Sequence, residues 1–258
     1  MFKFIRPKFL PLIVTGSGFL GLILRLWTIG NGPDANNLYA RQPVAWNLLW
    51  MLTLLVLAVS LIFLHRLKTP GQYHDSFPAS PISAGGCGLA AVGIACTVPA
   101  LMTAQNDSFS SFAGLAGFVA AAAMAYVAYC RFQGTKPSFA AHLSVALFMA
   151  LRVFIHCRIW SNEPQLGVFL FPLLAMIFLM LASFQFSCFD ADMAKRRSCL
   201  FWSLGGVYFS MVALAGSGDL AFYGCMILWL ITNLPSLRSL RTPPMQEILT
   251  EEPENPET

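Results

Sequence analysis

The sequence predicts an all-α protein: a polytopic integral membrane bundle of about eight transmembrane helices, with both termini in the cytoplasm. Of its 258 residues, 57% are hydrophobic and 11% are charged, whereas soluble domains carry about 25% charged residues. Long apolar runs recur along the chain, and positive charges gather in alternate connecting segments. The mean hydropathy of +0.64 excludes an ordinary soluble enzyme, a disordered regulator and a nucleic-acid-binding module. We therefore expect the lipid bilayer as a partner and no nucleic acid.

Eight segments have the roughly 20 mostly apolar residues that a membrane-spanning helix needs. They are approximately 9–29, 45–65, 84–104, 109–130, 138–160, 165–188, 198–217 and 220–237. Such unbroken runs exclude a transmembrane barrel, whose strands alternate polar and apolar residues. The first run, after a basic start, also resembles a signal peptide, but it continues to Ile29 without a convincing small-x-small cleavage site, so we expect a retained helix.

Three regions follow from this threading. Residues 1–8 form a basic cytoplasmic N-terminus, 9–237 form the transmembrane bundle, and 238–258 form a cytoplasmic tail. The tail region is acidic and rich in proline, a composition typical of disorder. It is either a docking segment for a partner protein or a solubilising end.

The positive charges predict the orientation. Twelve of the sixteen Lys and Arg residues fall in five segments that an eight-helix threading places on one side. They are Lys3, Arg6, Lys8, Arg66, Lys68, Arg131, Lys136, Lys195, Arg196, Arg197, Arg238 and Arg241. Because cytoplasmic loops carry an excess of Lys and Arg, this side is predicted to be the cytoplasm.

Two of the predicted helices, 84–104 and 109–130, are unusually rich in glycine and alanine. Small side chains let helix backbones approach closely within a membrane. We expect these two segments to form a tightly packed hairpin; a flexible gate is the alternative.

The helix 138–160 carries the most informative polar residues. His142, Arg152 and His156 fall within about 80° of one another around a helix. Arg152 lies near the middle of the span, where a charge costs at least about 2.5–3.5 kcal/mol. We therefore expect this face to point into the bundle rather than toward lipid.

No acidic residue lies within the middle of any predicted span, so a partner for Arg152 must come from elsewhere. The candidate acceptors are Asp34, Asp107, Glu163, Asp219, Gln185, Tyr208 and backbone carbonyls. The functional interpretation is a site for an anionic ligand or a proton relay, formed by Arg152, His156, His142, Gln185 and Tyr208. The alternative is a packing network whose hydrogen bonds are all satisfied internally.

Arg25 lies near the outer end of the first helix, where its side chain can reach the headgroups. It precedes Trp27 much as Arg158 precedes Trp160. This match suggests, without establishing, a duplication in which helices one to four correspond to helices five to eight.

Enzyme and cofactor motifs are not found. There is no Walker loop, no dinucleotide-binding fingerprint and no cysteine pair with the spacing of a zinc site, so we expect no cofactor, no metal and no catalytic residues. Asp190 and Asp192 precede a basic run. They could bind a divalent cation with a phosphate substrate, but a solvated loop is the expected interpretation.

Several stretches resemble a family of multi-pass membrane proteins of unknown function from anaerobic Gram-positive bacteria. They are Leu24-Arg25, the segment from Arg158 to Leu166, Phe189-Asp190 and the segment from Trp229 to Leu234. The resemblance implies a bacterial plasma membrane. It implies no activity and no site residues.

Three functions remain open, of which a lipid-modifying enzyme that uses Asp190 and Asp192 at the cytoplasmic surface ranks third. The first is a small-solute transporter or permease-like protein whose cavity is lined by the polar face of helix 138–160. The second is a non-catalytic accessory or sensor subunit of a membrane complex, with a membrane protein partner. An enclosed pocket around Arg152 would favour the first, and tight internal pairing of Arg152 would favour the second.

Overall fold

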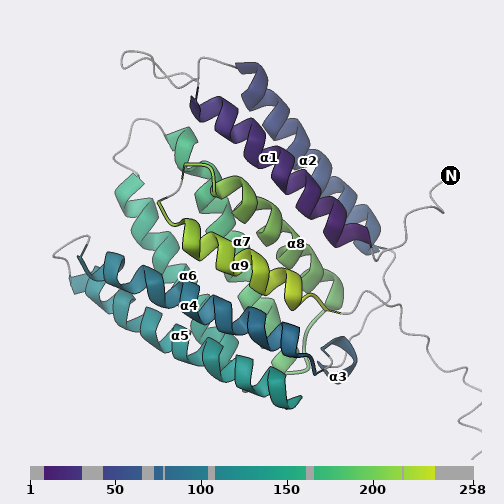
Figure 1. The fold of residues 1–258 in the computed structure, drawn as a ribbon, viewed down its shortest axis with the longest axis vertical. Coiled ribbons are helices and arrows are strands. Elements are labelled where there is room, and N and C mark those ends of the chain that lie inside the picture. Colours follow the sequence, from purple (N-terminus) through teal and green to yellow (C-terminus); the bar gives the residue numbers. More distant parts are fainter. Residues whose placement is uncertain are drawn as a thin grey trace, which may run out of the picture.

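The computed structural model is helical throughout the residues it describes, which are 9–30, 43–65, 73–77, 79–103, 108–160, 166–216 and 218–235 (Figure 1). The helices are α1 (Leu10–Gly30), α2 (Pro43–His65), α3 (Tyr73–Ser76), α4 (Pro81–Thr103), α5 (Ser108–Gln133), α6 (Phe139–Trp160), α7 (Leu166–Asp190), α8 (Arg196–Ala213) and α9 (Leu220–Thr232). The predicted basic terminus 1–8 and acidic tail 238–258 lie outside the described residues.

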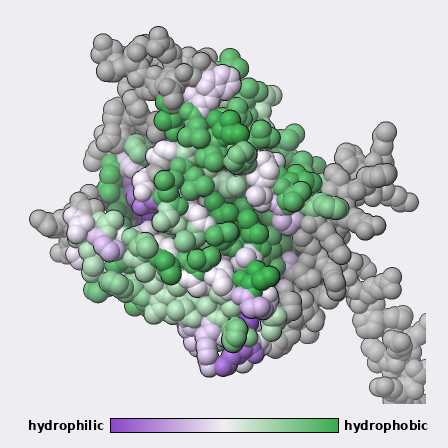
Figure 2. All heavy atoms as spheres, viewed as in Figure 1, coloured by the Kyte–Doolittle hydropathy of each residue, from purple (hydrophilic) through white to green (hydrophobic). Residues whose placement is uncertain are grey.

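Six of these helices, α1, α2 and α4 to α7, are long and apolar enough to cross a membrane. Figure 2 shows hydrophobic residues over most of the visible face, with hydrophilic residues mainly toward its margins. In water such a surface would be a large exposed apolar patch, whereas lipid chains cover it without cost. The prediction of an all-helical membrane bundle is therefore confirmed.

The last two helices are shorter than the sequence predicted. α8 has 18 residues and α9 has 13, which correspond to lengths of about 27 and 20 Å, against a hydrocarbon core of about 30 Å. α9 ends at Thr232 rather than near 237 because the Asn233 side chain caps its carboxyl end. The Asn233 side chain donates to the carbonyl oxygens of Trp229 and Ser83, and Pro235 cannot continue a helix.

Six helices form a closed ring, in which α4, α5, α6, α7, α8 and α9 each pack on the next and α9 packs back on α4. Side chains fill the interior of this ring, including Phe148, Phe186 and Trp229, all buried. α6 and α9 are not neighbours in the ring, yet the His142 and Trp229 rings lie 6.4 Å apart, centroid to centroid. Residues on the inner face of α6 therefore meet α9 across the interior.

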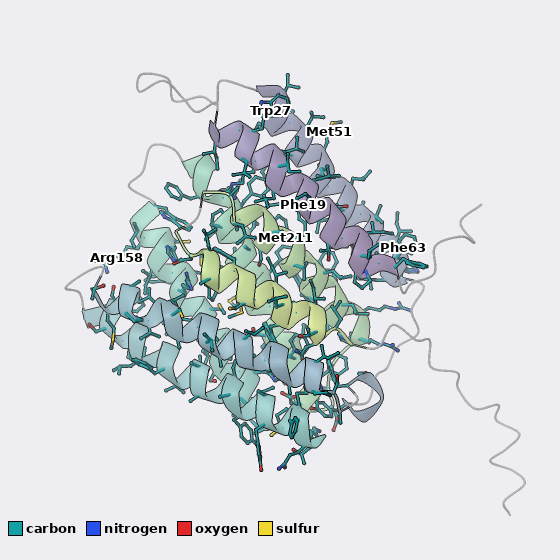
Figure 3. The ribbon with its side chains drawn as sticks, in the orientation of Figure 1. Phe19, Trp27, Met51, Phe63, Arg158 and Met211 are labelled. Atoms are coloured by element: carbon teal, nitrogen blue, oxygen red, sulfur yellow. The ribbon has the colours of Figure 1, made fainter. Side chains whose placement is uncertain are left out.

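The hairpin of α1 and α2 lies outside the ring and packs on α8 (Figure 1). Two glycines of α1 make this contact close. A Cβ atom at Gly18 would lie 2.8 Å from the sulfur of Met211, and one at Gly21 would lie 2.7 Å from Val212 Cγ2 (Figure 3). Small residues thus fix the hairpin against α8, as is common between helices in lipid.

The expected tight hairpin of small residues is also confirmed. A Cβ atom at Gly114 of α5 would lie 2.6 Å from Met102 Cγ of α4, and one at Gly117 would lie 2.7 Å from Val98 Cγ2. These positions leave no space for a side chain. The two helix axes can approach as closely as they do because the residues between them are small.

Two glycines of α4 provide a matched test of this close packing. A methyl group at Gly93 would lie 2.6 Å from Cys225 Cβ of α9, whereas one at Gly88 would have no neighbour within 4 Å among the described residues. Gly88→Ala is expected to raise the free energy of unfolding by up to about 1 kcal/mol, because alanine favours a helix. Gly93→Ala is expected to lower it by about 1 kcal/mol, because overpacking outweighs that gain. Thermal unfolding in detergent measures both; equal effects would contradict the close α4–α9 contact.

The four-residue helix α3 lies between two predicted spans, 45–65 and 84–104, in a segment for which the sequence predicted no helix. Phe77, directly after α3, packs on Phe186 and Phe189 of α7, with ring centroids 5.8 and 5.2 Å apart. α3 therefore covers the end of the ring at which α6 begins.

Candidate functional site

Arg152 lies on the inner face of α6 and is buried, as predicted. Its Nη2 donates to Asp219 Oδ2 in a salt bridge, and its guanidinium carbon lies 3.9 Å from the centre of the Phe222 ring. Asp219 precedes α9 and makes no capping bond to that helix through its side chain. Of the candidate acceptors, Asp219 is thus confirmed as a partner. Asp34, Asp107 and Glu163 lie outside the described residues.

The hydrogen-bonding capacity of Arg152 is only partly used. Its Nε and Nη1 atoms are buried and have no hydrogen-bond partner within the described part of the chain. Leaving a buried donor unsatisfied costs about 1–3 kcal/mol, and more for a charged group. Arg152 is therefore not part of a packing network in which every hydrogen bond is satisfied within the described residues. Its two unpaired nitrogen atoms can each donate to an additional acceptor.

His156 lies one helical turn beyond Arg152 and interacts electrostatically with both Arg152 and Asp219. Its ring stacks on Trp160 with centroids 4.6 Å apart, and Trp160 stacks on Phe169 of α7 at 4.8 Å. We call Arg152, His156, Asp219 and Phe222 the Arg152 cluster. By contrast, Arg158 is exposed at the end of α6 and points away from the bundle (Figure 3).

His142 lies at the other end of α6, about 15 Å along the helix from Arg152. Its Nδ1 is 2.5 Å from Asp190 Oδ2, and its ring stacks on Phe186 at 5.5 Å. Asp190, the last residue of α7, is buried. The sequence-based interpretation of Asp190 as part of a solvated loop is therefore wrong. The Asp190 side chain is buried and pairs with His142 at the end of the helix ring where α6 begins.

The remaining two candidates lie elsewhere. The Tyr208 hydroxyl is 2.9 Å from Thr53 Oγ1 of α2, so Tyr208 joins α8 to the outer hairpin. Gln185 is half-buried on α7, five residues before Asp190, at the end where α6 begins. Of the five predicted site residues, the structure thus brings together Arg152 and His156, and it separates them from the other three.

Three further charges differ from the sequence-based interpretation. Arg131 and Arg196 were assigned to connecting loops, but both are buried, at the end of α5 and the start of α8. Arg25 was expected to reach the headgroups; instead it is buried, and its Nη1 donates to the Val212 carbonyl oxygen at 3.3 Å. Since Arg25 is buried and Arg158 is exposed, the two residues that suggested a duplication have different environments.

Asp190 and Asp192 hold different partners, since Asp192 pairs with Lys136 in an exposed salt bridge. Within the described ranges, no group of three or more His, Cys, Asp or Glu side chains is placed to hold a metal ion. The geometry thus gives no support to a cation site formed by the two aspartates.

Comparisons with protein-family models, with curated proteins and with solved structures give no match to this chain.

Proposed function

We propose that the protein is a small-solute transporter of the permease type in a bacterial plasma membrane. In this proposal α8 and α9, with their flanking residues, complete eight spans, and both termini are cytoplasmic. The positive charges favour that orientation, because Lys136, Lys195 and Arg197 follow or precede helix ends on the side where α6 begins. The sequence resembles membrane proteins of anaerobic Gram-positive bacteria. This resemblance supports the proposed plasma membrane location and the proposal that the chain belongs to that family.

The observation that carries the transport proposal is the incompletely satisfied Arg152 in the interior of the helix ring. Its side chain is 2% exposed, and two of its nitrogen atoms have no hydrogen-bond partner within the described residues. Intramembrane charges that face a bundle interior commonly mark substrate or ion pathways. A small anionic solute, bearing a carboxylate or a phosphate, supplies the acceptors that Arg152 lacks.

The two buried pairs on α6 suggest how such a solute is admitted from one side at a time. Asp219 is 35% exposed, so it can move into water when an anion takes its place on Arg152. At the other end of α6, His142 and Asp190 form a second pair, in which both side chains are buried. In our proposal, the Arg152–Asp219 pair is the gate on one side and the His142–Asp190 pair is the gate on the other.

Electrical recording from proteoliposomes on a solid support tests this proposal. The vesicles are exposed in turn to short mono- and dicarboxylates and to inorganic phosphate. The wild-type protein should give a transient current with at least one of these anions. Arg152→Met should abolish that current, whereas Arg158→Met, which removes an exposed charge from the same helix, should retain it.

A second candidate function is a non-catalytic accessory or sensor subunit, favoured by the fact that Arg152 already has an internal partner in Asp219. It predicts no anion-dependent current. It also predicts a membrane protein that remains bound in native mass spectrometry after gentle extraction. The absence of current with every anion, together with such a partner, would replace the transport proposal by this one.

A further inference from the structure

The guanidinium of Arg131, at the end of α5, is buried and only partly hydrogen-bonded within the described residues. Arg131 is 2% exposed and forms no ion pair with a described residue, whereas Lys136 pairs with Asp192 and His142 pairs with Asp190 at the same end of the bundle. The Arg131 Nε and Nη1 atoms have no hydrogen-bond partner there. A buried charge without a partner is costly, which points to a missing anionic group.

Two aromatic rings pack against this guanidinium, and neither ring accepts a hydrogen bond from the two unpaired nitrogen atoms. Its central carbon lies 4.0 Å from the centre of the Phe77 ring and 5.0 Å from that of Tyr73. Burial raises the pKa of the Tyr73 hydroxyl, so Tyr73 is a neutral ring and supplies no countercharge. Cation–π contacts engage the face of a guanidinium, whereas hydrogen bonds to an anion form in its plane.

Further unpaired polar atoms lie in the same neighbourhood. Phe77 contacts both sides of this neighbourhood, since its ring centre lies 4.0 Å from the Arg131 guanidinium carbon and 5.2 Å from the ring of Phe189, the residue before Asp190. Asp190 Oδ1 is buried without a hydrogen-bond partner in the described residues, and so is Ser76 Oγ of α3. The neighbourhood thus offers donors on Arg131 and Ser76 and one acceptor on Asp190. We call these three residues the Arg131 cluster.

The Arg131 cluster lies at about the depth in the membrane at which lipid phosphate groups lie. Arg131 lies about ten residues from the middle of α5, or about 16 Å along the helix axis. Half of the hydrocarbon core is about 15 Å thick, so the guanidinium lies at the boundary with the headgroups. Lys136 and Lys195 are exposed and follow Arg131 and Asp190, respectively, by five residues, and such basic residues attract anionic lipids.

We propose that the Arg131 cluster binds a phosphate group that also offers a hydroxyl, as the headgroup of phosphatidylglycerol does. The Arg131 edge and the Ser76 hydroxyl donate to the phosphate oxygens, and Asp190 Oδ1 accepts from the ligand hydroxyl. Free hydrogen phosphate has the same chemistry. Phosphatidylcholine has the phosphate but no hydroxyl on its headgroup. The inference shares Asp190 with the proposed gate, but it does not require transport. Binding that depends on Arg131 tests the phosphate site, whereas the anion current that depends on Arg152 tests the transport proposal, so the failure of one is distinguishable from the failure of the other.

The test measures binding to the purified, delipidated full-length protein by native mass spectrometry and by thermal stabilisation. The three probes are sodium phosphate, short-chain phosphatidylglycerol and short-chain phosphatidylcholine. Phosphatidylglycerol should remain bound and raise the melting temperature, and phosphatidylcholine should do so much less. Stabilisation by sodium phosphate as well would identify the phosphate itself as sufficient, whereas its absence would identify the lipid as the source.

Arg131→Met and Lys195→Met each remove one positive charge from the same end of the bundle. Arg131→Met should weaken phosphatidylglycerol binding at least about tenfold, as expected when a charge-assisted hydrogen bond is lost. Lys195→Met should change it by less than about threefold, because exposed ion pairs contribute little. If Arg131→Met does not fold, Arg131→Lys serves instead and should also weaken binding. Equal binding by wild type and the Arg131 variants, or no binding of any probe, would overturn the inference.

Discussion

Asp219→Ala is expected to lower the free energy of unfolding by about 3–5 kcal/mol, the usual cost of leaving one member of a buried ion pair alone. The loss arises at Arg152, whose side chain is 2% exposed and would lose its ion-pair partner. It does not arise from helix capping, because the Asp219 side chain makes no capping bond to α9. Thermal or denaturant unfolding in detergent measures the effect.

Arg152→Met should cost less than Asp219→Ala, because the carboxylate that remains is 35% exposed and can be hydrated. The double variant should recover most of the stability lost in Asp219→Ala, since it removes the stranded charge. Arg158→Met is the matched control and should change stability by less than about 0.5 kcal/mol, as is usual at exposed positions. Strictly additive losses in the double variant would contradict the Arg152–Asp219 pair.

Asp190→Asn is expected to lower the free energy of unfolding by about 2 kcal/mol. The substitution weakens a buried bond between Asp190 and His142, and hydrogen bonds to charged groups contribute about 1.5–3 kcal/mol. It also buries an amide group that needs a new acceptor. The measurement is the same unfolding experiment, in the same lipid-free detergent.

Asp192→Asn provides the control for this prediction, two residues further along the chain. Asp192 is exposed and pairs with Lys136 at the surface, so its loss should cost no more than about 1 kcal/mol. Its φ of 56° lies in the left-handed region, which asparagine tolerates well. Equal losses for the two variants would mean that Asp190 is not the buried partner of His142.

The positions of the long helices could be predicted from the sequence because a spanning helix is a local property of about 20 residues. The predicted segment 138–160 became α6, Phe139–Trp160, and 165–188 became α7, Leu166–Asp190. α3 could not be predicted in this way. It has four residues, and its Tyr73 packs on Arg131 of α5, which lies more than 50 residues further along the chain.

The inward orientation of Arg152 could be predicted because a mid-span charge has few other options. The burial of Arg131, Asp190 and Arg196 could not be predicted, because a charge at the end of an apolar run is normally assigned to a solvated loop. Whether it faces water depends on which helix ends meet there. One signal was available: His142 lies near the start of α6, so its partner had to come from a neighbouring helix end.

The central claim is that the inner face of α6 lines a path for a solute. Met149 is buried on that face between His142 and Arg152, whereas Leu147 is 59% exposed on the side of α6 that would face lipid. The most direct test replaces each with cysteine and measures modification by a membrane-impermeant maleimide, in right-side-out and in inverted vesicles, by mass spectrometry of the α6 peptide. Both cysteines should react after denaturation in SDS. In intact vesicles, Met149→Cys should react from both sides and Leu147→Cys from neither. If Met149→Cys reacts from neither side, the interior of the ring is closed and the protein is not a transporter of this design.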